Sequence, residues 1–226
     1  KAKMQQERRV KRAENVEGDF WVDSTCIDCD TCRWMAPATF TRANGMSAVT
    51  AQPAGHVERV RAMQALLSCP TYSIHTDSRT AQELSEAQVG LPALVPGVPG
   101  VFHCGWHDVK SYAATSYLIV RPPAQGGNIL VDCPRYNPVL ARNIAALGGV
   151  SHIFLTHKDD VGDHDKWARH FNALRTMHQS EVRAGTAGVE VQLRGEGPWA
   201  LDGTPLPAPA TASGSSSSSS SRGSSS

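Results

Sequence analysis

Three of the chain's six cysteines fall within seven residues, at Cys26, Cys29 and Cys32, and this spacing constrains the fold more than any other feature. A fourth, Cys69, lies downstream and is followed by a proline. A secreted disulfide scaffold distributes its cysteines through a short chain, whereas a tight triplet in a chain of 226 residues favours metal ligation. The pattern therefore predicts a metal centre, and it implies a reducing compartment.

Four thiolates with this spacing suit an iron–sulfur cube. Two-residue gaps let one loop present three sulfurs to the same cube, and the fourth sulfur must come from a distant segment. An amphipathic helix predicted over 56–67 can deliver that sulfur, and Pro70 stops the helix. We therefore predict that a 4Fe-4S cluster is held by Cys26, Cys29, Cys32 and Cys69. A zinc site and incidental thiols are the alternatives, and loss of one ligand would give a 3Fe-4S form.

These residues resemble the bacterial-type ferredoxins, in particular the single-cluster members that keep one cysteine triplet and end on a remote Cys-Pro. The similarity covers residues 19–78 and implies an α+β ferredoxin-like domain there. It also implies an electron-transfer or redox-sensing role together with a redox partner protein. Trp21, Trp34 and Phe40 are candidates to shield the cluster from solvent.

The rest of the chain divides by composition. A strand is expected at 20–22 and a hairpin over 40–52, with its turn at Asn44-Gly45. Strands alternating with helices after residue 100 indicate an α/β layer. The predicted order is a basic polar segment at 1–18, the ferredoxin-like domain at 19–78, a Pro/Gly-rich linker at 79–100, the α/β domain at 101–204, and a disordered Ser-rich tail at 205–226.

A second group of polar residues follows the strand expected at 151–156. Here His157, Asp159, Asp163 and His164 lie in one turn that leads directly into a helix expected over 162–171. Imidazole and carboxylate ligands suit zinc, iron or manganese, so these four residues predict an incomplete second metal site. The alternatives are that Asp163 caps the helix and that Asp159 is a solvated loop residue.

The motif resembles the H-x-H-x-D-H signature of the metallo-β-lactamase superfamily, with Asp159 in place of the middle histidine. The turn is two residues longer than the signature, and the family's later metal ligands have no counterpart after His164. The resemblance implies the N-terminal half of that fold, so the second domain is expected to be a partial α/β metallo-β-lactamase-like domain. A metal-dependent hydrolase of an ester or thioester with a structural cluster, and a non-catalytic interaction protein, are the alternative functions.

The remaining cysteines and histidines are given minor roles. Cys104 and Cys133 are expected to be plain thiols, and His103 and His107 to be exposed or hydrogen-bonded residues of a hairpin. A balance of 22 basic against 21 acidic residues does not suggest a nucleic-acid partner, and no apolar run is long enough to span a membrane. The arrangement resembles fusions found in plants and green algae, which implies the chloroplast stroma or the cytoplasm as its location.

Overall fold

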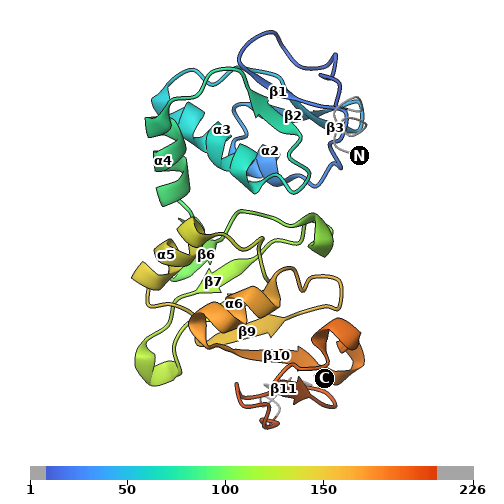
Figure 1. The fold of residues 1–226 in the computed structure, drawn as a ribbon, viewed down its shortest axis with the longest axis vertical. Helices are drawn as coiled ribbons and strands as arrows, with labels where there is room; N and C mark the ends of the chain where they lie inside the picture. Colours follow the sequence, from blue (N-terminus) through green and yellow to red (C-terminus); the bar gives the residue numbers. More distant parts are fainter. Residues whose placement is uncertain (1–8, 208–226) are drawn as a thin grey trace, which may run out of the picture.

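The computed structural model describes residues 9–207, which form two domains stacked along the long axis of the molecule (Figure 1). The first is small and surrounds helix α3, and the second is built on one sheet. The predicted disordered tail lies outside the described residues from 208 onward, whereas Leu206 still donates its backbone N–H to the Pro198 carbonyl. Among the described residues, no helix is both long enough and apolar enough to cross a bilayer.

The first domain consists of two short antiparallel ribbons and two helices that enclose a small apolar core. The hairpin turns at Asn44-Gly45 as predicted, and Phe20, Phe40 and Met63 are fully buried between the ribbons and α3. Its elements are β1 (Phe20–Val22), α2 (Thr31–Met35), β2 (Phe40–Ala43), β3 (Met46–Val49), α3 (His56–Ser68) and β4 (Ile74–Thr76), with β1 paired to β4 and β2 to β3.

Residues 9–18 of the basic N-terminal segment pack against this domain, which the polar composition of the segment did not predict. The backbones of Lys11 and Asp23 form an isolated antiparallel β-bridge. The buried Arg12 guanidinium donates to the carbonyls of Ser47 and Ala43. Asp23 is fully buried and accepts hydrogen bonds from Arg9 and His75. Burial acts to raise the pKa of Asp23, but its hydrogen bonds, led by those from Thr25 and His75, hold that pKa below its usual value.

The segment predicted as a linker is ordered, which corrects the 79–100 assignment. It contains helix α4 (Ala81–Val89), which packs along α3, and strand β5 (Ala93–Leu94), which belongs to the second domain. Thr80 and Glu83 form a capping box at the start of α4, and Glu83 also pairs with Arg59 of α3. The connection between the domains is therefore packed against the first domain through α4 and paired with the second domain through β5.

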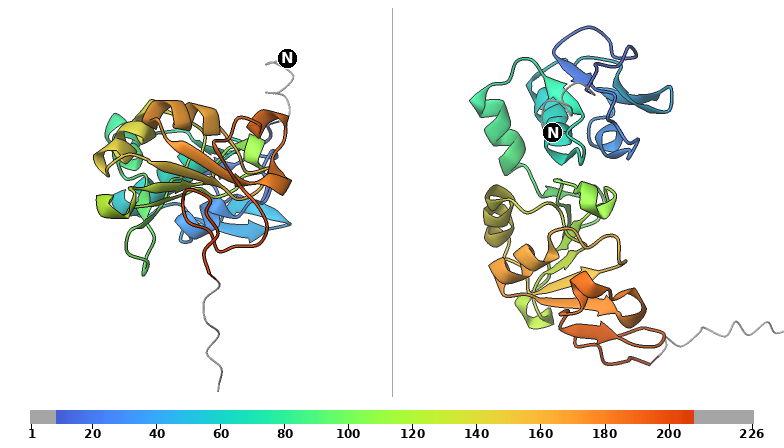
Figure 2. Two further views of the ribbon diagram at one scale, coloured as in Figure 1. Left: turned by 90° about the horizontal axis from the view of Figure 1, so that it is seen from below. Right: turned by 45° about the vertical axis from the view of Figure 1, so that its right-hand side comes forward.

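A seven-stranded sheet forms the second domain, with helices on one face (Figures 1 and 2). Strands β5 to β8 are antiparallel neighbours, whereas β8 to β11 run parallel. Helix α5 joins β8 to β9, helix α6 joins β9 to β10, and a segment with two short 3-10 turns joins β10 to β11. The further elements are β6 (Val101–His103), β7 (Tyr117–Ile119), β8 (Ile129–Val131), α5 (Pro138–Ala146), β9 (His152–Leu155), α6 (His164–Phe171), β10 (Leu174–His178) and β11 (Val191–Leu193).

The two faces of this sheet are buried to different extents. Alternate strand residues such as Leu118, Leu130 and Ile153 are fully buried in the core that includes residues of α5 and α6. Their neighbours Ile129 and Phe154 are only partly buried and line an apolar pocket on the opposite face. The helix-covered face therefore carries most of the burial that stabilises this domain.

Asp132, directly after β8, forms hydrogen bonds with residues that flank the two neighbouring strands, β7 and β9. Its carboxylate accepts hydrogen bonds from the backbone N–H and the hydroxyl of Thr156 at 2.8 Å each, and its carbonyl accepts from the Ser116 hydroxyl. Burial raises the pKa of Asp132 to about 6, although the hydrogen bonds from Thr156 oppose the shift. Folding therefore favours the protonated carboxyl group.

We expect the native protein to lose stability as the pH rises, because Asp132 ionises, and we expect Asp132→Asn to abolish that dependence on pH. Between about pH 4 and 6 the unfolded chain is already ionised at Asp132 while the folded chain retains the proton, so the folded state is destabilised as the pH rises through that window. An asparagine amide can accept from the Thr156 N–H and donate to its hydroxyl without ionising. At pH 8 the variant should be more stable by roughly 1–3 kcal/mol, measured by urea denaturation at pH 4 and pH 8. Glu196→Gln, at an exposed site of the same domain, controls for loss of one charge, and parallel stability profiles of Asp132→Asn and the native protein would refute the assignment.

Candidate functional site

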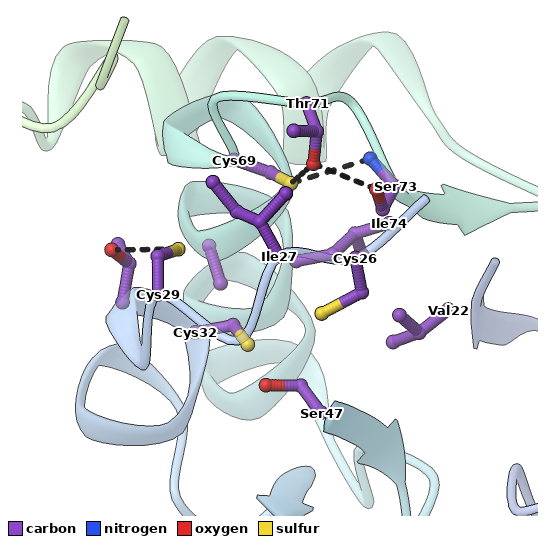
Figure 3. A pocket seen from close by; sticks show the side chains of 12 residues that line it. Val22, Cys26, Ile27, Cys29, Cys32, Ser47, Cys69, Thr71, Ser73 and Ile74 are labelled. Atoms are coloured by element: carbon purple, nitrogen blue, oxygen red, sulfur yellow. Dashed lines mark hydrogen bonds between the residues drawn. The ribbon is translucent and has the colours of Figure 1, made fainter. Parts of the chain in front are cut away.

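The four predicted cysteine ligands line one pocket in the first domain (Figure 3). Cys26 and Cys29 come from the loop that leads out of β1, Cys32 lies in the first turn of α2, and Cys69 follows the last residue of α3. Cys32 and Cys69 are buried, and Cys26 and Cys29 are partly buried. Cys69, at the end of the distant helix α3, therefore lies in the same pocket as the triplet, and the assignment of these four thiols as cluster ligands stays a prediction.

Backbone conformation explains how one short loop presents three thiols. Asp28 and Asp30, the residues on either side of Cys29, both have positive φ angles, of 57° and 68°. Their carboxylates accept hydrogen bonds from the guanidinium of Arg33, at 2.6 Å from Asp28 and 2.5 Å from Asp30. Arg33 therefore stabilises the strained turn, and its hydrogen bond lowers the pKa of Asp28.

The pocket combines apolar walls with a few hydrogen-bonding groups. Val22, Ala65 and Ile74 contribute apolar surface, and Ile27, which is 48% exposed, lies at its outer side. The Ser73 backbone N–H donates to Cys69 Sγ at 3.3 Å, and the Thr31 hydroxyl lies 3.5 Å from Cys29 Sγ. These are the surroundings that a sulfur-ligated centre needs, because hydrogen bonds to the sulfurs and exclusion of water tune its properties.

The thiol chemistry of the pocket fits a multi-iron cluster. Burial raises the pKa of Cys29, and it raises that of Cys32 to about 12, with the nearby cysteines adding to both shifts. Such thiols stay protonated unless a cation stabilises the thiolate. Among residues 9–207, no three His, Cys, Asp or Glu side chains are grouped closely enough to hold one metal ion. Four cysteines that line one pocket are the number of thiolates that a 4Fe-4S cluster requires.

The second predicted metal site is not assembled in the described part of the chain. His157 and Asp159 lie in the loop after β9 and are 43% and 48% exposed, and His157 also lies 3.5 Å from Glu181. Asp163 and His164 are buried and have other partners: Asp163 accepts from the Tyr136 backbone N–H, and His164 Nδ1 lies 3.3 Å from the Arg175 guanidinium. The structure therefore divides the four residues into two pairs with protein partners.

One smaller expectation about this region is also corrected. Asp163 stands at the N-cap of α6, but its side chain forms no capping hydrogen bond, so the helix-capping alternative is wrong for the carboxylate. Gly162, with φ of 48°, passes so close to the Cys133 carbonyl that an added Cβ would lie 2.2 Å from its oxygen. The turn before α6 is therefore shaped by close backbone packing.

Of the two alternatives predicted for His103 and His107, the hydrogen-bonded one is found and the exposed one is not. They are 1% and 0% exposed, and they lie at the boundary between the domains. His107 Nδ1 is 3.2 Å from the Thr31 hydroxyl of the cysteine loop, and the His103 ring contacts Trp34 edge-to-face at 4.4 Å. Sequence reasoning missed this placement because the contact partners lie some 70 positions away in the chain, and only the H-x-x-x-H spacing marked the pair.

Other contacts join the cysteine-bearing segments to the second domain. The Ser68 carbonyl accepts from the His107 backbone N–H, and the Leu67 carbonyl accepts from the Arg135 guanidinium, which stacks over the Tyr72 ring. Gly105, with φ of 66°, approaches so closely that an added Cβ would lie 2.7 Å from Ser68 Oγ. The end of α3 that carries Cys69 is therefore also a docking point for the second domain.

Comparisons with known proteins bear on the two domains differently. No curated protein matches the chain. Among solved structures, the chain is similar to the Rm3 metallo-beta-lactamase, with 26% identity, a TM-score of 0.28, and coverage of 36% of this chain and 30% of that one. The aligned part thus spans less than a third of that protein, and the metallo-β-lactamase-like assignment stays a prediction. Residues 22–76 match the family model of the 4Fe-4S single cluster domain of Ferredoxin I, a span that contains all four cysteines, and the prediction of a single-cluster 4Fe-4S ferredoxin domain here is thereby confirmed.

Proposed function

We propose that this protein exchanges single electrons with a redox partner protein through a 4Fe-4S cluster held by Cys26, Cys29, Cys32 and Cys69. The observation that carries the proposal is the convergence of the four thiols on one largely apolar pocket next to the surface. When bound, the cluster supplies a one-electron couple. The protein's own contribution is to hold the four sulfurs, to limit access of water, and to donate hydrogen bonds to the sulfurs.

The surface around the pocket supports contact with a partner. Ile27, Trp34 and Tyr72 are each about half exposed and lie next to or within three residues of a cysteine ligand. Exposed aromatic and aliphatic side chains of this kind are common at the centres of protein interfaces. A partner that docks here would bring its own redox centre towards the partly buried Cys26 and Cys29.

Redox sensing is the neighbouring alternative, and it makes a different demand on the molecule. A sensor must change the second domain when the cluster is reduced, whereas a carrier needs only to pass the electron on. Hydrogen exchange measured on the oxidised and reduced protein separates the two roles. Unchanged protection at 103–107 favours electron transfer, and a large change there favours sensing. The stromal or cytoplasmic location stays a prediction.

The hydrolase alternative receives no comparable support. Its candidate ligands His157, Asp159, Asp163 and His164 contact protein partners, and within residues 9–207 they do not gather around one point. We therefore assign no catalytic residue in the second domain.

Anaerobically purified protein should contain about four irons per chain and give a reduced-state EPR signal of a single cluster. Cys69→Ala removes one ligand and should abolish the signal and most of the iron. Cys104→Ala is the matched control, because Cys104 is also a buried thiol but lies outside the pocket, and it should retain both. Zinc in place of iron, or full iron in Cys69→Ala, would contradict the proposed ligand set.

Thr31→Val should lower the reduction potential of the cluster without reducing its iron content. In the structure the Cys29 thiol donates to the buried Thr31 hydroxyl oxygen, which also lies 3.2 Å from His107 Nδ1. A thiolate ligand has no proton to donate, so the hydroxyl would donate to it instead, and such a hydrogen bond stabilises the more negatively charged reduced state. A spectroelectrochemical titration measures the shift. Thr41→Val, on the exposed side of the β2–β3 hairpin, is the matched control and should leave the potential unchanged. A potential in Thr31→Val equal to or above the native value would show that the hydroxyl does not donate to the sulfur.

A further inference from the structure

His107 lies at the boundary between the domains, and the backbone around it is held in a strained conformation. Its neighbour Trp106 has a φ of 51°, and Ala113, whose carbonyl contacts the His107 ring, has a φ of 69°. Positive φ angles are uncommon in residues other than glycine and persist only where the surrounding contacts fix them. His107 is fully buried, and its backbone N–H donates to the Ser68 carbonyl. The fold therefore fixes this ring beside the cysteine-bearing segments.

The position of the ring proton on His107 follows from the groups around it. Burial lowers the pKa of His107 to about 4, and the Arg135 charge acts in the same direction, so the ring is neutral at pH 7 and carries one N–H. His107 Nδ1 lies 3.0 Å from the Ala113 carbonyl oxygen, which can only accept. The proton is therefore on Nδ1, and His107 Nε2 is the acceptor that faces His103 Nε2 at 2.8 Å.

The protonated nitrogen also faces the Thr31 hydroxyl, which belongs to the first domain. Thr31 Oγ1 lies 3.2 Å from His107 Nδ1, so the N–H is shared between this oxygen and the Ala113 carbonyl in a three-centre hydrogen bond. Thr31 cannot donate to a nitrogen that already carries a proton. The Thr31 oxygen therefore accepts from His107, and the hydroxyl proton must point to another partner.

The Cys29 sulfur is the other hydrogen-bond partner of this hydroxyl within residues 9–207, at 3.5 Å. Thr31 is only 3% exposed, so water does not compete for the hydroxyl, and the protein groups around it decide its direction. Once Cys29 has lost its proton as a ligand, its sulfur can only accept. The sulfur is then the acceptor that remains for the Thr31 proton.

We propose that His107 is a positioning residue of the cluster site: its Nδ1–H donates to the Thr31 oxygen and so directs the Thr31 hydroxyl proton to the Cys29 thiolate. A hydrogen bond at that sulfur stabilises the more negatively charged reduced state. The second domain thereby raises the reduction potential through a residue that acts by way of Thr31 rather than on the sulfur itself. This role deepens the proposed electron-transfer function and rests on it.

Reduction potentials of the cluster-loaded full chain, measured by spectroelectrochemical titration in a double-mutant cycle, test the proposal. His107→Leu removes the donor, and we expect about a three- to tenfold fall in the equilibrium constant for one-electron reduction, which corresponds to a potential lower by about 30–60 mV. Thr31→Val should also lower the potential. Adding His107→Leu to Thr31→Val should produce no further fall, because both changes remove the same hydrogen bond to the sulfur. Additive shifts, or a native potential in His107→Leu, would overturn the positioning role.

Two further variants separate this role from a general effect of the domain boundary. His103→Leu is the matched control, because His103 is also a buried histidine of the boundary but bonds to His107 rather than to Thr31. It should keep the native potential, and a fall equal to that of His107→Leu would refute the proposal. His107→Asn places an amide N–H close to the position of Nδ1 and should recover most of the lost potential. A potential as low as that of His107→Leu would count against a donor role.

The position of the proton can also be measured without any substitution. Nitrogen NMR of the histidine-labelled protein distinguishes a protonated Nδ1 from a protonated Nε2, and a proton on His107 Nε2 would refute the proposal even where a variant fails to fold. A native protein without a one-electron cluster couple would end the proposed function and this inference together. A normal couple with the same potential in the native protein and in His107→Leu would end the inference alone and leave electron transfer standing.

Discussion

The meeting of four thiols on one pocket is the constraint around which the first domain is arranged. Cys26 and Cys29 can face Cys32 only because Asp28 and Asp30 adopt positive φ angles. Arg33 donates hydrogen bonds to the side-chain carboxylates of both aspartates. The fourth thiol has to return from a distance, and the 13 residues of α3 carry the chain roughly 20 Å to Cys69. A domain of this size has little core of its own, so ligand-mediated closure of the loop contributes to its stability.

The same segments also make the boundary with the second domain. Thr31 lies between a cysteine and His107, and the carbonyls at the end of α3 accept hydrogen bonds from the second domain just before Cys69. Helix α4 runs alongside α3 and leads directly into β5 of the large sheet. The two domains are therefore joined through the elements that position the sulfurs, with the His103–His107 pair filling the interior of that boundary.

Local sequence signals predicted the elements whose causes are local. The cysteine spacing, the Asn44-Gly45 turn and the helix before Cys69 each depend on residues within a few positions, and each is found in the structure. Helix α4 was not predicted, because prolines and glycines follow it in the sequence, although the Thr80–Glu83 capping box is a signal for its start. Strand β10 was missed because Leu174-Arg-Thr-Met-His lacks an alternating pattern, and its pairing with β9 and β11 decides its conformation.

The features that could not be predicted depend on contacts between distant segments. Burial of Arg12 depends on carbonyls more than 30 positions away, and burial of His103 and His107 depends on a neighbouring domain. The turn at 157–164 carries the right residue types for a metal. However, Asp163 accepts a hydrogen bond from the Tyr136 backbone, and His164 contacts the Arg175 guanidinium. Residue chemistry alone could not show that competition.

The docking of Ser68, Leu67 and Thr31 onto the second domain has a consequence for how the two domains depend on each other. The segments that contact the second domain are the same segments that carry Cys29, Cys32 and Cys69. A substitution at His107 or Arg135 therefore alters the surroundings of two thiol-bearing segments without changing a cysteine.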